Sequence, residues 1–203
     1  LGDEPGLTAS QRQWIVAREA ELQLASGYVE EALTHLLRSI QRLGGVEGRT
    51  GAELLLLLAR GYYELGRFED ALRQTERALA LVDEASALAG EATLLAGRIR
   101  QMQGDLEASR DLFTLVVSDF PGSEASLSGL LGLAEVNASM SNSDASLEAY
   151  EGLVERLGGG EKTREVTTEI VTESLIRQQR ERFIREDFDT ALAYARLARR
   201  LNA

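Results

Sequence analysis

The chain of 203 residues has 44% hydrophobic and 27% charged side chains, a composition typical of a folded globular protein. Its formal net charge of −11 disfavours nucleic-acid binding, because a phosphate backbone is bound by clustered basic side chains. The absence of cysteine excludes disulfides, thiolate metal sites and cysteine nucleophiles.

A short frame recurs along the chain: a turn residue, an apolar residue two positions later, and a small residue three positions after that. Glycine is the turn residue at Gly27, Gly66 and Gly104, and the frame continues without glycine at Ser141 and Glu186. Recurrence at a period between about 20 and 50 residues is typical of stacked-repeat proteins. With only two prolines and abundant Ala, Leu, Glu and Arg, the sequence predicts an all-α protein built from repeated helix pairs.

The second repeat shows the pattern most clearly. Its first helix carries apolar residues at helical spacing, namely Leu55, Leu58, Ala59 and Tyr62. Gly66 allows a tight turn, because glycine adopts a left-handed helix end without steric cost. A second helix then buries an inner face made of Phe68, Ala71, Leu72, Ala78 and Leu79.

These positions resemble the tetratricopeptide repeat, a 34-residue helix–turn–helix unit, over nearly the whole chain. Five divergent units are expected, approximately at 9–43, 51–83, 89–121, 126–157 and 162–203. The resemblance implies a single domain, a right-handed α-solenoid of stacked antiparallel helix pairs. Because the chain begins with Leu rather than Met, we expect it to be a fragment of a longer protein.

The spacings between successive turns, 39, 38, 37 and 45 residues, exceed 34, and the extra residues fall between one unit and the next. The glycine-rich segment 44–51 is expected to be a loop followed by an early helix start. The largest insertion contains Glu165, Glu169 and Glu173 at four-residue intervals. This spacing predicts a lengthened first helix in the fifth unit, although the β-branched residues around Val166 also favour a strand.

No motif for catalysis, cofactor binding or metal binding is found. The segment 157–163 contains three glycines and Lys162, but it does not match a phosphate-binding loop. That motif needs glycine six residues before the lysine and immediately before it, where Arg156 and Glu161 stand. The single histidine, His35, has no partner for a metal site in its sequence pattern, and we expect it to face solvent or a neighbour. The longest apolar run, 54–59, is too short to cross a membrane. Cytoplasm and bacterial periplasm are both compatible with this sequence.

The resemblance implies that the first helices line a concave face on which partner segments lie. The positions usually exposed there are Ala17, Glu21, Leu24, Leu56, Arg60, Tyr63, Leu94, Arg98, Gln101, Leu131, Glu135, Ala138, Ile176, Arg180 and Phe183. Arg60 and Arg98 could hold a carboxylate in a bidentate way while Tyr63 packs an apolar side chain.

The leading hypothesis is a non-enzymatic scaffold, without cofactor or metal, that binds a protein or peptide partner along this face. A second hypothesis is a self-assembly module whose terminal repeats pack end to end. Because the sequence stops just after the last helix, three leucines would be partly bare there, namely Leu192, Leu197 and Leu201, and we expect either further residues of a longer protein or, second, another copy to cover them. A third hypothesis is an accessory domain of a larger multidomain protein. Neither nucleic-acid binding nor membrane insertion is expected.

Overall fold

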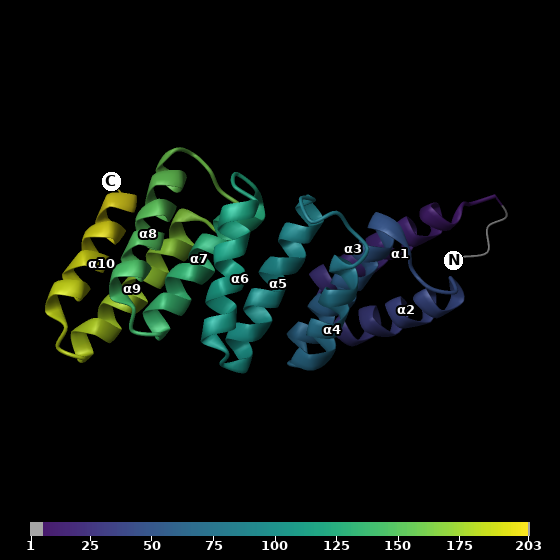
Figure 1. The fold of residues 1–203 in the computed structure, drawn as a ribbon, viewed down its shortest axis with the longest axis horizontal. Helices are drawn as coiled ribbons and strands as arrows, with labels where there is room; N and C mark the ends of the chain where they lie inside the picture. Colours follow the sequence, from purple (N-terminus) through teal and green to yellow (C-terminus); the bar gives the residue numbers. More distant parts are fainter. Residues whose placement is uncertain (1–5, 203) are drawn as a thin grey trace. The chain divides into compact units, whose positions relative to one another are not determined.

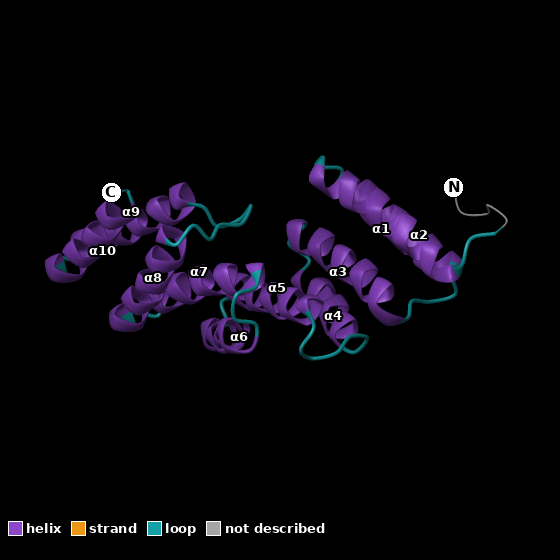
Figure 2. Cartoon of the chain, turned by 90° about the horizontal axis from the view of Figure 1, so that it is seen from above, coloured by secondary structure: helices purple, strands orange, loops and turns teal. Residues whose placement is uncertain are grey.

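The computed structural model describes residues 6–202 and contains, in that range, ten α-helices and no strand (Figures 1 and 2). The helices are α1 (Ala9–Ala25), α2 (Val29–Arg42), α3 (Gly48–Glu64), α4 (Phe68–Leu79), α5 (Ala87–Gln103), α6 (Leu106–Asp119), α7 (Glu124–Ser139), α8 (Ser143–Gly158), α9 (Thr168–Ile184) and α10 (Phe188–Leu201). Within the described residues, α1 packs on α2, α3 on α4, α7 on α8 and α9 on α10 as consecutive helix pairs. The prediction of an all-α fold is confirmed.

The helices belong to two compact units, Leu1–Gln103 and Gly104–Ala203. In the first unit α3 contacts α1, α2, α4 and α5, so that one first helix lies against its own partner and both neighbouring pairs. In the second unit α7 contacts α6, α8 and α9, and α10 lies beside α8 and α9 (Figure 1). The assignment of all five pairs to a single repeat domain stays a prediction.

The turn within each pair has the same backbone conformation. Gly27, Gly66 and Gly104 have φ values of 81°, 70° and 81°, and Ser141 and Glu186 have 63° and 62°. The residue after the turn residue closes the helix end at Gly27, Gly66, Ser141 and Glu186; for example, the Arg67 N–H donates to the Tyr62 carbonyl at 2.8 Å. This is the Schellman arrangement, which needs a left-handed residue. The frame found in the sequence is therefore a helix C-terminus followed directly by a new helix.

Each unit has its own apolar core. In the first unit small residues at helix crossings, such as Ala20, Ala59 and Ala71, are fully buried beside Leu36 and Leu58. In the second unit the core is built on Tyr150, Tyr194, Leu127, Leu153 and Leu175. Because these residues recur at the apolar and small positions of the repeat, burial follows the sequence pattern closely.

The segment before α9 corrects one prediction. Residues 161–167 are not helical, α9 begins only at Thr168, and its 17 residues match α1, α3 and α5 in length. The Thr163 hydroxyl accepts hydrogen bonds from the backbone N–H groups of Glu165 and Val166, at 3.2 and 2.9 Å. Threonine hydroxyls that bond local backbone groups compete with helix formation. The expected lengthened helix is wrong, whereas the expected early start of the second unit's first helix, at Gly48, is confirmed.

Candidate protein-binding surface

The predicted surface residues of the first unit lie on α1, α3 and α5. Glu21 and Arg60 are exposed, whereas Tyr63, Arg98 and Gln101 are half-buried. Leu56 and Leu94 are only 3% and 7% exposed, so the prediction that they face a partner is wrong. Leu56 lies on α3 and Leu94 on α5, and the central turns of these two helices are apolar on nearly every side. Helices of this kind are buried rather than half-exposed.

Arg60 already has a carboxylate partner. Its guanidinium donates to Glu91 of α5 at 2.9 Å, and both side chains are about half exposed, at 47% each. A second charged group lies on α1 and α3, where Arg18 pairs with Glu21 at 2.6 Å and approaches Glu53 at 3.7 Å. The Arg60–Glu91 and Arg18–Glu53 contacts join successive first helices. Exposed pairs of this kind contribute only about 0–1 kcal/mol, so a partner's charge can replace either member.

Aromatic residues follow Arg60 in the sequence, at the end of α3 and the start of α4. The rings of Tyr63 and Phe68 are 6.0 Å apart and tilted by 57°, which connects the end of α3 to the start of α4. The Arg67 guanidinium lies 4.6 Å from the centre of the Tyr62 ring. Tyr63 is therefore held by a neighbour while remaining partly accessible, as an anchor for an apolar side chain requires.

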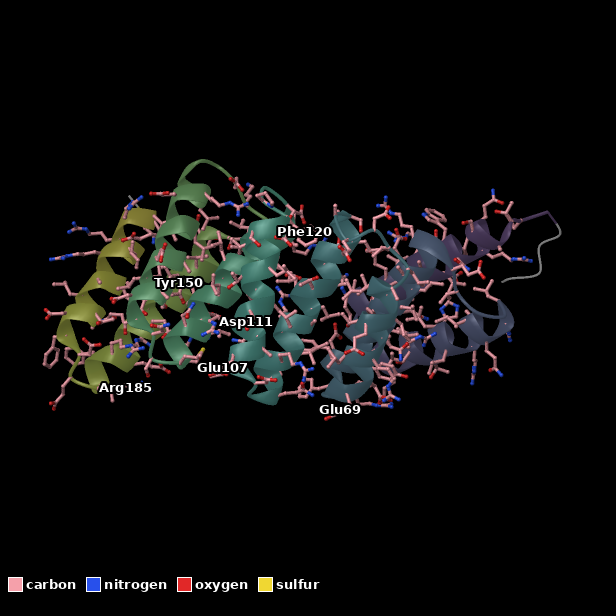
Figure 3. All side chains as sticks on the ribbon, viewed as in Figure 1. Glu69, Glu107, Asp111, Phe120, Tyr150 and Arg185 are labelled. Carbon is pink, nitrogen blue, oxygen red and sulfur yellow. The ribbon has the colours of Figure 1, made fainter. Side chains whose placement is uncertain are left out.

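In the second unit the predicted residue Glu135 is part of a hydrogen-bonded network. Its carboxylate accepts from the Ser174 hydroxyl at 2.6 Å and from Arg177 at 2.5 Å, and Ser174 bonds the Tyr150 hydroxyl at 2.8 Å. Burial raises the pKa of Tyr150 well above its ordinary value, so this phenol stays protonated and can donate to Ser174. Figure 3 shows Tyr150 on α8. The network links α7, α8 and α9.

The remaining predicted positions of the second unit differ in exposure. Leu131 is half-buried and Ala138 is buried, whereas Ile176, Arg180 and Phe183 are exposed along α9. Within residues 6–202, Arg180 has neither an ion-pair nor a hydrogen-bond partner. Phe183 packs its ring edge-on against Phe188 at 5.4 Å. In the second unit, the predicted surface residues that are exposed are therefore those of α9, namely Ile176, Arg180 and Phe183.

Two buried polar groups were missed by the sequence analysis. Ser146, at the small-residue position where the repeat family has alanine, donates to the Ala134 carbonyl at 2.8 Å and accepts from the Tyr194 hydroxyl at 2.9 Å. Arg182, which is almost completely buried, donates to the Ala138 carbonyl at 3.0 Å, at the C-terminal end of α7. The only signal in the sequence was the serine in place of alanine.

The described residues contain no group of three or more His, Cys, Asp or Glu side chains that could hold a metal ion. His35 of α2 is partly exposed and lies 3.3 Å from a carboxylate oxygen of Glu19 on α1, so it faces a neighbouring helix as expected. No helix in the described range combines the length and the hydrophobicity needed to traverse a lipid bilayer.

No protein-family model and no curated protein matches the chain. Solved structures do match. BtubC from P. vanneervenii is 16% identical with a TM-score of 0.74, over 96% of this chain and 81% of BtubC. The TPR-like repeats of a putative kinesin light chain from Podosopora anserina are 17% identical with a TM-score of 0.72, over 97% of both chains. A Rap protein complexed with competence and sporulation factor is 14% identical with a TM-score of 0.67, over 97% of this chain and 65% of Rap.

These likenesses show the fold. The chain has the tetratricopeptide-like helical-repeat fold, as its turn residues and packing positions predict.

Proposed function

We propose that the chain is a non-enzymatic scaffold that binds a segment of a partner protein along the exposed faces of its first helices. The observation that carries the proposal is the solvent-exposed ion pair between Arg60 and Glu91, with the partly accessible Tyr63 three residues after Arg60 on the same helix. In this model a carboxylate of the partner replaces Glu91 on the Arg60 guanidinium, and an apolar side chain packs on the Tyr63 ring. The fold supports the proposal, because a Rap protein with this fold forms a complex with competence and sporulation factor.

The test begins with a random peptide library selected against the purified chain. We expect the enriched peptides to place an acidic side chain near an apolar one. Their affinity should fall about fivefold or more with Arg60→Ala or Tyr63→Ala, because truncating an interface anchor costs over about 1 kcal/mol. Arg73→Ala on α4 is the matched control, since Arg73 is exposed and also ion-paired, here with Asp70.

Glu91→Gln gives a second readout of opposite sign. It removes the carboxylate that competes for Arg60, so acidic peptides should bind roughly two- to fivefold more tightly, in line with the small energy of exposed ion pairs. Isothermal titration calorimetry measures both changes. Equal affinity of wild type, Arg60→Ala and Glu91→Gln for the enriched peptides would exclude this surface as the binding site.

A further inference from the structure

Helix α3 carries two opposite charges on one face. Glu53 and Arg60 are seven residues apart, which is nearly two full turns, so their side chains project from the same side of the helix. With a rise of about 1.5 Å per residue, the two residues lie about 10 Å apart along the helix axis. In the first unit α3 contacts both α1 and α5. The surroundings of this face are therefore formed by helices that the structure describes.

The Glu53 carboxylate has only long contacts with basic side chains. Nitrogen atoms of Arg18 and Arg49 lie 3.7 and 3.5 Å from its oxygen atoms. Both distances exceed the usual range of an N–H···O hydrogen bond, about 2.7–3.2 Å. Within residues 6–202 this carboxylate accepts no hydrogen bond, and its side chain is only 24% exposed, so solvent satisfies it only in part. Glu53 is thus ready to accept a hydrogen bond from an added basic side chain.

The two arginines near Glu53 are not committed to it. Arg18 is held by Glu21 of its own helix at 2.6 Å, and its contact with Glu53 is the longer one. The Arg49 side chain is 80% exposed. Because an exposed ion pair contributes little to stability, Arg49 moves into solvent at little cost when another cation approaches Glu53.

The Arg60 end of the same face has the opposite charge and the same kind of partner. Its counter-ion Glu91 is about half exposed and lies 2.9 Å away. Between the two charges, Leu56 and Leu57 of α3 are buried. The face therefore has one replaceable ion pair at each end, and the exposed side chains of α3 place no requirement on what lies between them.

We propose that the partner segment carries a basic and an acidic side chain three residues apart, with the basic one on Glu53 and the acidic one on Arg60. A polyproline II segment has three residues per turn and rises about 3.1 Å per residue. Residues three apart in it project from the same side about 9 Å apart, close to the separation along α3. An apolar side chain follows the acidic one, because Tyr63 lies beyond Arg60 on the helix. The inference rests on the proposed function and specifies its partner.

The charge of the whole chain favours such a bipolar segment over a purely acidic one. A segment with several acidic side chains is repelled by the net charge of −11. A segment with one basic and one acidic side chain avoids this repulsion and still pairs with Arg60. Complementary charges at two fixed points also set the direction in which the segment lies along α3.

Two synthetic peptides of equal composition test the inference. The matching peptide contains Lys, two alanines, Glu and Leu in this order, flanked by prolines; the exchanged peptide has its Lys and Glu interchanged. By isothermal titration calorimetry, we expect wild type to bind the matching peptide about fivefold more tightly, as for one favourable exposed ion pair. The double variant Glu53→Lys with Arg60→Glu should prefer the exchanged peptide. Equal affinities for wild type, no binding of the matching peptide, or a preference that the double variant leaves unchanged would each overturn the inference.

Milder variants keep the test valid if the charge reversal unfolds the chain. Glu53→Gln should weaken binding of the matching peptide about three- to fivefold and leave unchanged the affinity for a peptide with Ala in place of Lys. Arg49→Gln should strengthen binding of the matching peptide about twofold, because it removes the competing cation. Glu76→Gln is the matched control, since Glu76 is an exposed carboxylate on α4, and it should change neither affinity. Circular dichroism confirms that each variant is folded.

This inference and the proposed function fail in different ways. If Arg60→Ala weakens binding of the enriched peptides but Glu53→Gln has no effect on the matching peptide, the scaffold proposal stands and the basic position in the partner is wrong. If neither substitution changes any affinity, the whole α3 surface is excluded.

Discussion

Two turn residues, Ser141 and Glu186, hold a backbone conformation that glycine holds in the other three helix pairs. Their φ values of 63° and 62° lie in the left-handed region, where a side chain meets the following carbonyl. The turn forms regardless, because the helix-closing hydrogen bonds are still made, at 2.8 Å from Asn142 to Asn137 and 3.0 Å from Asp187 to Arg182. The glycines in the repeat therefore reduce strain and are not strictly required.

Glu186→Gly and Ser141→Gly should each stabilise the chain by about 0.5–1 kcal/mol, because removal of the Cβ relieves left-handed strain and outweighs the added freedom of the unfolded chain. The free energy of unfolding, measured by urea titration, checks this. The reverse change, Gly66→Ala, should destabilise by a similar amount. No atom lies within 4 Å of a Cβ at Gly66, so only backbone strain is introduced there. A stability loss on Glu186→Gly would show that its side chain has a packing role.

Between helices, buried hydroxyl groups form hydrogen bonds that fix one alignment, whereas apolar packing alone is less directional. The Ser146 hydroxyl on α8 bridges the Ala134 carbonyl of α7 and the Tyr194 hydroxyl of α10. The rings of Tyr150 and Tyr194 meet edge-on at 5.8 Å beside this bridge. Because buried polar groups are costly when unpaired, such a network favours one alignment of the helices over the others.

Ser146→Ala should destabilise the chain by about 1–3 kcal/mol, because it leaves the buried Tyr194 hydroxyl without a partner. Tyr194→Phe removes the other member of the bond. The double variant should cost clearly less than the sum of the single ones, since neither partner is then left unpaired. Thermal and urea unfolding of the four proteins measure the coupling; additive losses would rule out a bond that matters for stability.

The whole chain combines a net charge of −11 with an apolar core in each of its two units. Repulsion between like charges opposes the folded state, whereas burial of apolar side chains favours it. Salt weakens the repulsion and hardly affects the burial.

The free energy of unfolding should therefore increase as the ionic strength rises from about 0.01 M to about 0.15 M, over which the Debye length falls from about 30 to about 8 Å. Urea titration at each salt concentration measures this free energy. A lower stability with added salt would indicate that surface ion pairs outweigh the net repulsion.

The repeats themselves were predictable, because turn, apolar and small positions act over a few neighbouring residues. The start of α9 was not. The four-residue spacing of Glu165, Glu169 and Glu173 is helical, but the hydroxyls of Thr163 and Thr167 bond the backbone locally, and Val166 is fully buried outside the helix. Spacing alone does not show which of these competing local bonds forms.

The series of helices could be predicted from the sequence, since each helix and turn depends on residues close together along the chain. Which first-helix residues remain accessible, in contrast, follows from tertiary packing. Leu56 and Leu94 are buried, Arg60 is paired with Glu91, and Arg180 and Phe183 are exposed. The exposure and pairing of a side chain depend on neighbours from other helices, and helical periodicity does not reveal those neighbours.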